Sequence, residues 1–318
     1  MLIHIVGLHA PNAPRLQALL GEAYRVQGMP SFPATGEAAD VVVTNAVDAA
    51  QAASLRCRLL QVPGAGTEQI AADALPPGCT VANVHGHEVP IAEFTIHAIL
   101  EHVLAPWKLP PVLDETAWPA VYAARPIHGE AAGRTVTLVG HGHIGREVAR
   151  RARALDMRVV AVTRRGQLGP ADGVDQSVPV SRLAEVLPRS DILVLCCPLD
   201  ENTRGLIDAA ALARLPRDAL LVNVARAEVV DEAALYEALR SGRLGRAVLD
   251  VWYRYPKPGQ ASVAPAHHPL HALPNVRATP HISAMTPGLL TRRYAFIAEN
   301  IKRLAAGLDP LNVVVPPR

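Results

Sequence analysis

The sequence has little cysteine, almost no net charge and no long uninterrupted apolar run. Its four cysteines, at positions 57, 79, 196 and 197, show no Cys-x-x-Cys spacing, which favours reduced structural thiols over a redox or metal motif. The 31 basic residues exceed the 29 acidic ones by two and are scattered, so no basic footprint for a nucleic acid or an anionic membrane is present. Small-molecule chemistry is the better expectation.

Apolar stretches also end before the ~20 residues that a membrane-spanning helix requires. In the segment after Ile91, for example, Glu93, His97 and Glu101 interrupt the apolar pattern. The start, Met1–Gly7, resembles a strand and a turn and lacks the regions of a signal peptide. We therefore expect a cytoplasmic protein whose partners are small molecules, with neither a nucleic acid nor a membrane among them.

Short apolar runs alternate with helical patterns along the whole chain, which is typical of a parallel α/β fold. The length of 318 residues fits about two domains. The first series of predicted strands comprises residues 2–6, 40–43, 59–62 and 81–84. The second comprises residues 135–139, 159–162, 192–196, 220–224, 247–251 and 276–279, and six strands fit a doubly wound sheet.

The domain boundary is predicted near the end of a longer helical pattern that runs from Pro90 to Pro106. A second helical pattern after His281 and the Val-rich tail are expected to return to the first domain. We thus predict an α/β protein with two doubly wound parallel sheets. Residues 1–103 and 285–318 would form one of these domains, and residues 104–284 the other.

The strongest local motif is Gly140-His141-Gly142-His143-Ile144-Gly145, which follows an apolar strand and opens a helical pattern. In such a loop the first glycine permits a tight turn and the second lets the backbone approach a pyrophosphate. The third allows close helix packing, while the helix N-terminus supplies amide donors. The motif in this context predicts a dinucleotide site. Further candidate cofactor-binding residues are Cys197, Pro198, Thr203, Val224 and Ala225.

The next strand ends in Thr163-Arg164-Arg165, where NAD-binding proteins usually place a carboxylate for the ribose hydroxyls. No Asp or Glu occurs between Met157 and Ala171. Without that acid a 2′-phosphate is not repelled, and either arginine can bind it through charge-assisted hydrogen bonds. We predict a preference for NADP(H), with NAD(H) as the alternative.

Three later segments, Asn223–Leu235, Leu249–Trp252 and Thr279–Ser283, complete an ordered set with the phosphate loop. In order and spacing this set resembles the D-isomer-specific 2-hydroxyacid dehydrogenase family. Val62–Thr67 and Ile91–Glu93 are similar to that family's substrate loop and interdomain helix. The resemblance implies an NAD(P)-dependent enzyme that transfers a hydride between a nicotinamide and C2 of a 2-oxo or 2-hydroxy acid, in a cleft between two domains. Residues 1–103 and 285–318 would be a flavodoxin-like substrate domain, and residues 104–284 a Rossmann-type dinucleotide-binding domain.

The resemblance also implies roles for individual residues. Arg226 matches the substrate-binding arginine, His281 the acid/base, and Asp250 the residue near the nicotinamide carboxamide, while the backbone at Ala65 and Gly66 would hold the substrate carboxylate. Chemistry independently asks for such groups, because a guanidinium fork addresses a carboxylate and a carbonyl together. A histidine titrates near neutrality, as a proton donor to the carbonyl must.

One departure concerns the glutamate that the family places 29 positions after the arginine, where it hydrogen-bonds the histidine. Position 255 is tyrosine here, and no Asp or Glu occurs between Val251 and Ala298. A neutral phenol does not stabilise imidazolium as a carboxylate does, so we expect a lower pKa for His281 than is usual in the family.

Three interpretations follow from Tyr255. In the first, its hydroxyl orients His281 in a working reductase of the glyoxylate or hydroxypyruvate type that forms a D-2-hydroxy acid. In the second, the chain oxidises formate, as relatives that also lack the glutamate do, with no proton moved to substrate oxygen. In the third, it is a non-catalytic NAD(P) sensor; retention of Arg226 and His281 argues against this.

Three minor expectations remain. His87 lies in a loop that the resemblance places at the cleft, where it is a candidate substrate contact. His267, His268 and His271 crowd a Pro-rich loop with no carboxylate or cysteine nearby in the sequence, so no metal is expected. The apolar stretch from Pro106 to Gly129 matches the family's dimer contact, and we expect a homodimer.

Overall fold

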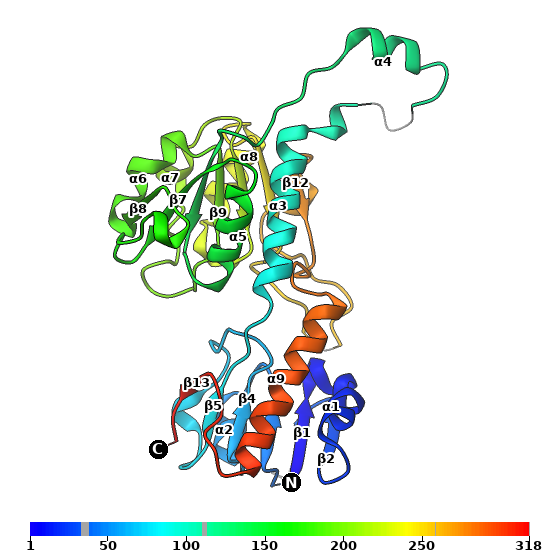
Figure 1. The fold of residues 1–318 in the computed structure, drawn as a ribbon, viewed down its shortest axis with the longest axis vertical. Coiled ribbons are helices and arrows are strands. Elements are labelled where there is room, and N and C mark those ends of the chain that lie inside the picture. Colours follow the sequence, from blue (N-terminus) through cyan, green and yellow to red (C-terminus); the bar gives the residue numbers. More distant parts are fainter. Residues whose placement is uncertain (33–37, 110–112, 258, 318) are drawn as a thin grey trace. The chain divides into compact units, whose positions relative to one another are not determined.

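The computed structural model describes residues 1–32, 38–109, 113–257 and 259–317 (Figure 1). The chain divides into two compact units, Met1–Gly86 with Met285–Arg318 and His87–Ala284. In the described part of the chain, none of the helices has both the length and the apolar character needed to cross a membrane.

The first unit contains a six-stranded sheet in the order β13-β5-β4-β3-β1-β2. Its strands are β1 (Leu2–Val6), β2 (Arg25–Met29), β3 (Val41–Val43), β4 (Leu59–Gln61), β5 (Thr80–Ala82) and β13 (Val313–Val315). Strands β1 to β5 pair in parallel, and β13 joins β5 in the antiparallel sense, so the tail returns to this unit as predicted.

Helices cover both faces of this sheet. They are α1 (Ala13–Leu20), α2 (Ala49–Ser54) and α9 (Pro287–Ala305). One core joins α1 and α9 to the sheet through Leu16, Tyr294 and Ile297, whereas the other face packs around Ala52 of α2 and Leu60 of β4. Strand β2 was not predicted, because its five residues are only half-buried or exposed and therefore carry no strong apolar alternation.

The second unit contains a seven-stranded sheet in the order β12-β11-β10-β9-β6-β7-β8, with every pair parallel. The strands are β6 (Thr135–Val139), β7 (Arg158–Thr163), β8 (Gln176–Pro179), β9 (Ile192–Leu195), β10 (Leu220–Asn223), β11 (Arg246–Leu249) and β12 (Val276–Ala278). Seven strands replace the six expected. Strand β8 escaped prediction because Val178 is its only buried residue.

The helices of this unit are α3 (Glu88–Leu104), α4 (Trp118–Ala124), α5 (His143–Arg153), α6 (Leu183–Val186), α7 (Ala209–Leu212) and α8 (Glu232–Arg240). One core packs α3 and α5 on the sheet and the other packs α6, α7 and α8 on the opposite face. Short 3-10 helices span Gly7–Asn12 and Ala72–Ala74 in the first unit. In the second unit they span Pro106–Lys108, Pro170–Asp172, Val180–Arg182, Leu187–Arg189, Ala227–Val229 and Leu270–Ala272. The prediction of two doubly wound parallel-sheet domains is confirmed.

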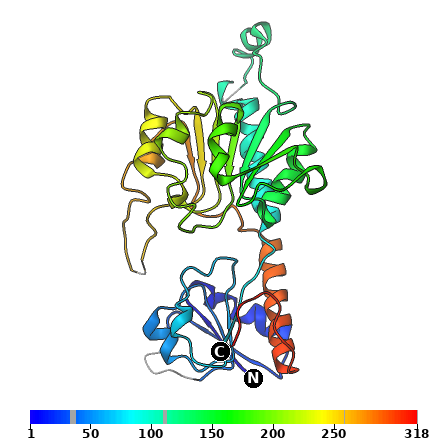
Figure 2. The same ribbon diagram turned by 90° about the vertical axis from the view of Figure 1, so that its left-hand side faces the viewer.

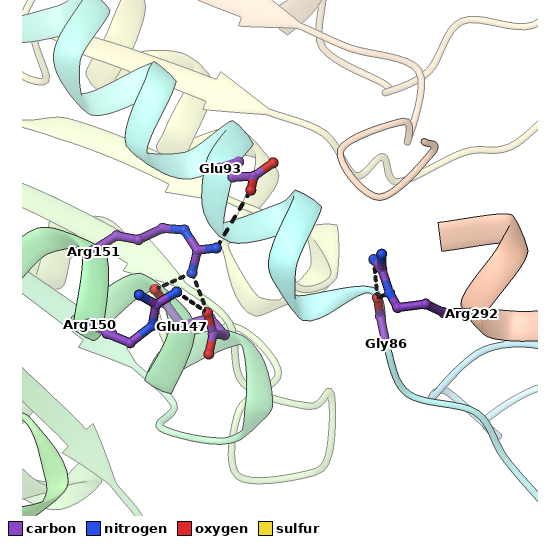
Figure 3. Close-up of polar contacts among 6 residues, drawn as sticks. All are labelled: Gly86, Glu93, Glu147, Arg150, Arg151 and Arg292. Atoms are coloured by element: carbon purple, nitrogen blue, oxygen red, sulfur yellow. Dashed lines mark hydrogen bonds and ion pairs between the residues drawn. The ribbon is translucent and has the colours of Figure 1, made fainter. Parts of the chain in front are cut away.

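Helix α3 belongs to the second unit. Its Ile91, Ala98 and Ile99 share a core with Val148 and Ala149 of α5. Polar contacts reinforce this packing (Figure 3): Arg151 lies 3.6 Å from Glu93 and also pairs with Glu147. The predicted boundary after residue 103 assigned this helix to the first domain, whereas the compact units divide after Gly86 because the apolar face of α3 is buried on α5.

The last residue before that division is held within the first unit. Arg292 of α9 donates to the carbonyl oxygen of Gly86 at 2.9 and 3.3 Å, as Figure 3 shows. The bond fixes the chain that leaves β5 against the N-terminal turns of α9.

The segment that follows α3 extends away from the sheet of its unit and carries α4 at its far end (Figures 1 and 2). Its apolar side chains are exposed: Trp107, Leu109, Leu113, Trp118, Tyr122 and Ile127. Residues 110–112 of this stretch lie outside the described part of the chain.

Candidate functional site

Most of the predicted site residues follow the carboxyl ends of strands in the seven-stranded sheet. The phosphate loop follows β6, Thr163–Arg165 end or follow β7, and Arg226, Asp250 and His281 come soon after β10, β11 and β12. Because all these strands are parallel, their carboxyl ends meet at one edge, which is where ligands bind in doubly wound folds.

The three glycines of the phosphate loop have different surroundings. Gly140 is left-handed at φ 102°, and a Cβ there would lie 2.8 Å from the amide nitrogen of Cys197. A Cβ on Gly145 would lie 2.5 Å from the carbonyl oxygen of Gly140. At Gly142, by contrast, a Cβ would meet nothing within 4 Å. Packing within the chain thus explains why a side chain is excluded at Gly140 and Gly145. At Gly142 the open space can be occupied by a bound molecule.

The N-terminus of α5 fits an anion. Gly142 is its N-cap and supplies no side-chain hydrogen bond, so the first amides of this eleven-residue helix have no side-chain cap. His143 is exposed at the first helical position, and Ile144 is half-buried behind it. A pyrophosphate is the group that such a glycine-rich turn and helix start accommodate.

His141 differs from the rest of the loop, because its imidazole is buried. Its Nε2 lies 3.0 Å from the carbonyl oxygen of Asp172, and its Nδ1 is buried without a hydrogen-bond partner among the described residues. Burial lowers the pKa of His141. The neutral ring is engaged with the Pro170–Asp172 turn, so a contact to the cofactor would come from the backbone.

The end of β7 carries the two arginines that we assigned to the 2′-phosphate. Thr163 Oγ1 accepts a hydrogen bond from the amide of Gly166 at 3.0 Å, which closes the turn after the strand. The side chain of Arg164 is 85% exposed and lies 3.9 Å from a carboxylate oxygen of Asp200; Arg165 is exposed as well. Asp200 was not predicted as a neighbour of Arg164, because it lies outside residues 157–171 and comes from the loop after β9.

The loop after β9 holds its own shape. Thr203 Oγ1 donates to the carbonyl of Pro198 at 2.8 Å and accepts from the amide of Asp200 at 2.8 Å. Asp200 in turn accepts from the amides of Asn202 and Thr203 at 2.8 and 3.0 Å. The hydroxyl of Thr203 is therefore used inside the loop. Burial raises the pKa of Cys197 to about 11, so this residue is a thiol packed beneath the loop.

Arg226 is positioned by an asparagine that the sequence analysis did not single out. Buried Asn223 accepts from the amide of Ala225 at 3.0 Å and donates to the carbonyl of Arg226 at 3.0 Å. Val224 and Ala225 are buried, and the Arg226 guanidinium donates to the Ala225 carbonyl at 2.8 Å. The side chain of Asn223 at the strand end was the available signal, because Asn commonly shapes turns by bonding to nearby backbone.

Asp250 organises the turn that presents His281. Its Oδ1 accepts from Thr279 Oγ1 at 2.7 Å and from the amide of Ile282 at 2.8 Å, and its Oδ2 accepts from the amide of Ser283 at 3.0 Å. Asp250 is 1% exposed. The wrapped turn holds His281 at φ 58°, a left-handed conformation that costs a non-glycine residue about 1–3 kcal/mol. Such stored strain is typical of functional sites.

Tyr255 contacts His281 directly. Its Oη lies 2.8 Å from Nδ1 of the imidazole. The amide of Trp252 donates to the same Oη at 3.2 Å, and the Trp252 indole donates to the carbonyl of Thr279 at 2.8 Å. Tyr255 and Trp252 thereby connect the loop after β11 to the turn after β12.

The pKa values of this pair follow from burial and from four neighbouring residues, Trp252, Arg226, Asp250 and Glu228. Burial lowers the pKa of His281, the carboxylate of Asp250 opposes that change, and the positive charge of Arg226 adds to it. Burial raises the pKa of Tyr255, against the Trp252 amide and Arg226, which lower it. Arg226 follows β10 at the same edge of the sheet, and its positive charge acts on both rings.

The C-terminal part of the loop that carries Tyr255 is bonded to Glu232, the first residue of α8. Glu232 lies 2.9 Å from His267 Nδ1 and accepts from the amide of His268 at 2.6 Å. Glu232 supplies these histidines with a carboxylate that is absent from their own loop, because it comes from a segment distant along the chain. Among the described residues, no group of three His, Cys, Asp or Glu side chains is placed to hold a metal ion.

The remaining substrate candidates are Ala65, Gly66 and His87. Ala65 and Gly66 lie in the loop after β4 of the first unit, where Asn83 donates to the carbonyl of Ala65 at 2.9 Å. Within the described part of the chain, the amides of Ala65 and Gly66 donate no hydrogen bond, so they are available to an anion. His87 precedes α3, and its side chain does not cap that helix.

Comparison with known proteins places this geometry in context. A family model described as "D-isomer specific 2-hydroxyacid dehydrogenase, NAD binding domain" matches residues 112–283. The (S)-sulfolactate dehydrogenase of Chromohalobacter salexigens is 34% identical over 245 residues, which cover 76% of this chain and 75% of that protein. The D-3-phosphoglycerate dehydrogenase of Archaeoglobus fulgidus is 32% identical over 265 residues, or 82% of this chain. That match spans only 48% of the Archaeoglobus protein.

Among solved structures, the NADPH-dependent glyoxylate/hydroxypyruvate reductase of Sinorhizobium meliloti, in complex with NADP and sulfate, has a similar fold. It superposes with a TM-score of 0.75 at 23% identity, covering 98% of this chain and 97% of that one.

Proposed function

The chain belongs to the D-isomer-specific 2-hydroxyacid dehydrogenase family, and we propose that it reduces a small 2-oxo acid to the D-2-hydroxy acid, as glyoxylate and hydroxypyruvate reductases do. One observation carries this proposal: Tyr255 Oη lies 2.8 Å from Nδ1 of His281 at the carboxyl edge of a sheet whose phosphate loop fits a dinucleotide, and Arg226 follows β10 at the same edge. A fixed cation beside a protonatable imidazole is what carbonyl reduction needs.

Each residue has a proposed task. Arg226 binds the carboxylate and carbonyl of the substrate, the amides of Ala65 and Gly66 hold the carboxylate, and His87 contacts a polar substituent. His281 exchanges a proton with the substrate oxygen, and Tyr255 orients its ring. The nicotinamide, when bound, supplies or accepts the hydride.

We propose that the unit of residues 87–284 binds the dinucleotide and that the other unit carries the substrate loop. The backbone of residues 140–145 would hold the pyrophosphate, Asp250 would face the carboxamide, and the loops at Cys197–Thr203 and Val224–Ala225 would line the site. NADP(H) is preferred over NAD(H), because Arg164 and Arg165 are exposed where a 2′-phosphate would lie and the strand end has no acid of its own. The fold relative from Sinorhizobium holds NADP.

Two alternatives predict different results in one assay. Formate oxidation needs no proton transfer to substrate oxygen, and a sensor needs no turnover. We would follow absorbance of the nicotinamide with glyoxylate, hydroxypyruvate, pyruvate, phenylpyruvate and formate, each with both cofactors. Turnover of a 2-oxo acid that falls about 10²-fold or more in His281→Asn is the expected outcome. Turnover of formate alone, or tight NADPH binding without any turnover, would replace the proposal by the corresponding alternative.

We propose that the protein is a homodimer formed through the segment of residues 106–129. The described residues of this segment expose several apolar side chains, Ile127 being 97% exposed, and apolar surface of this kind marks protein interfaces. Light scattering should give the dimer mass for the wild type and the monomer mass for a Trp118→Asp, Tyr122→Asp double variant. A monomeric wild type would refute the proposal. A cytoplasmic location stays a prediction.

A further inference from the structure

Tyr255 stands where the family resemblance leads us to expect a glutamate, and its phenol brings a proton of its own. A carboxylate in this position accepts a hydrogen bond from imidazolium and keeps the ring charged. A phenol does the opposite, since its O–H can donate to a neutral Nδ1. At 2.8 Å the distance between Oη and Nδ1 is that of a direct hydrogen bond.

We propose that Tyr255 and His281 form a proton relay, in which the phenol replaces each proton that the imidazole gives to the substrate. The proposal rests on the reductase function proposed above and specifies the origin of its proton. In the starting state the Oη–H of Tyr255 donates to Nδ1, and His281 is neutral with its proton on Nε2.

The relay moves two protons and leaves the imidazole neutral. As the substrate carbonyl oxygen becomes an alkoxide, the Nε2–H bond breaks and an O–H bond forms on the product. At the same time the Oη–H bond breaks and an Nδ1–H bond forms. The ring has exchanged one tautomer for the other, and the negative charge has moved from the substrate oxygen to the phenolate, which then takes a proton from water.

The surroundings of Oη suit a transient phenolate. The Trp252 amide donates to Oη at 3.2 Å, and the new Nδ1–H would be a second donor. Tyr255 also lines a cavity of about 670 Å³ together with Arg254, Lys257, Gly259, Gln260 and Val263. Tyr255 as a residue is 49% exposed, so water can return the proton.

The charged groups around the two rings also favour a neutral imidazole. Burial and Arg226 lower the pKa of His281 against the opposing effect of Asp250. Arg226 lowers the pKa of Tyr255, while burial, Asp250 and Glu228 raise it. An enzyme that relied on imidazolium would lose reductase activity above the low pKa of His281. The relay removes that limit until Tyr255 itself ionises.

The pH profile of kcat/KM for 2-oxo acid reduction distinguishes the two routes. With the relay, the wild type keeps a flat profile from about pH 6 to about pH 8. In Tyr255→Phe the proton must come from imidazolium, whose population falls by up to tenfold per pH unit above its pKa, so kcat/KM of the variant should decline steadily across the same range. Tyr255→Glu restores a carboxylate and should shift this decline to higher pH.

Tyr253→Phe is the matched control. It removes a phenol hydroxyl from the same loop, one that donates to the carbonyl of Val230 and not to His281. This variant should keep the wild-type shape of the profile. Identical profiles for the wild type and Tyr255→Phe, or a wild-type profile that falls tenfold per pH unit, would overturn the relay.

A readout without turnover separates failure of the relay from failure of the reductase assignment. The ¹⁵N chemical shifts of the His281 ring should show the neutral Nε2–H tautomer at pH 7 in the wild type and a change in Tyr255→Phe. A wild-type Nδ1–H tautomer, or imidazolium, would refute the relay whatever the substrate. The expected tautomer in a protein that reduces no 2-oxo acid would refute the reductase function and, with it, the relay that depends on it.

Discussion

The guanidinium of Arg164 lies 3.9 Å from a carboxylate oxygen of Asp200, although the two residues follow strands that are not neighbours. Strand β6, with the phosphate loop at its end, lies between β7 and β9. The acid missing from the end of β7 is therefore supplied from another loop. It lies beside one of the two cations that would bind a 2′-phosphate and partly offsets its charge.

Cofactor choice should respond to both residues in opposite directions. Arg164→Ser should lower the ratio of kcat/KM for NADPH to that for NADH by about tenfold, because a charge-assisted contact to the 2′-phosphate is lost. Asp200→Asn should raise the ratio about two- to fivefold, the effect expected for an exposed charge pair. Arg158→Ser, at the opposite end of β7, is the control and should leave the ratio unchanged. Equal losses with both cofactors in Arg164→Ser would contradict the assignment.

Two glycines of the phosphate loop should separate binding from folding. In Gly142→Ala the added methyl meets open space, so the melting temperature should hold while dinucleotide affinity falls about tenfold or more. In Gly145→Ala the methyl meets the Gly140 carbonyl, and overpacking of this kind costs about 1–3 kcal/mol of folding stability. Differential scanning fluorimetry and calorimetric titration measure the two effects. Undiminished cofactor affinity in Gly142→Ala would remove the pyrophosphate from this loop.

We expect Asp250 to contribute to folding stability as well as to cofactor binding, because it accepts three hydrogen bonds in the turn. Asp250→Ala leaves the Ile282 and Ser283 amides and the Thr279 hydroxyl without their acceptor, and we expect a loss of about 2–4 kcal/mol in urea unfolding. Asp208→Ala removes a single N-cap bond to Ala211 and should cost about 1 kcal/mol. If the two variants lose the same stability, the turn does not depend on Asp250.

The sequence predicted the features that have a strong residue pattern, namely the phosphate loop and the fully buried strands. The phosphate loop was readable because glycine spacing encodes backbone geometry, and the structure gives Gly140, Gly142 and Gly145 three different environments. Strands β6, β9 and β10 were readable because every residue in them is buried. Strands β2 and β8 were not, since they lie at sheet edges with few buried side chains.

Contacts between loops that are distant in the chain could not be predicted from the sequence. Asp200 approaches Arg164, and Glu232 approaches His267, only because the sheet brings together segments that lie more than 30 residues apart in the chain. The tyrosine at position 255 was noticed as a departure from the family. Its bond to Nδ1, and the second bond from the Trp252 amide, depend on a backbone path between them that no residue pattern encodes.

The first unit should contribute its own dependence of stability on pH through His9. The ring hydrogen-bonds Tyr294 Oη at 2.9 Å, and burial, with help from the charge of Arg293, lowers the pKa of His9 to about 4 from an ordinary value of 6.5. Between about pH 4 and about pH 6.5, His9 is therefore protonated in the unfolded chain and neutral in the folded chain. Stability is complete above about pH 6.5 and falls as the pH drops toward about 4, by up to about 3 kcal/mol from this residue.

His9→Gln keeps an acceptor for the Tyr294 hydroxyl and removes the titration. Compared with the wild type, it should lose less stability between about pH 7 and about pH 4.5, while His281 and the carboxylates contribute equally to both proteins and cancel. Urea unfolding at several pH values, followed by tyrosine fluorescence and circular dichroism, measures the difference. Parallel curves for the two proteins would mean that His9 accepts its proton in the folded state as readily as in the unfolded chain.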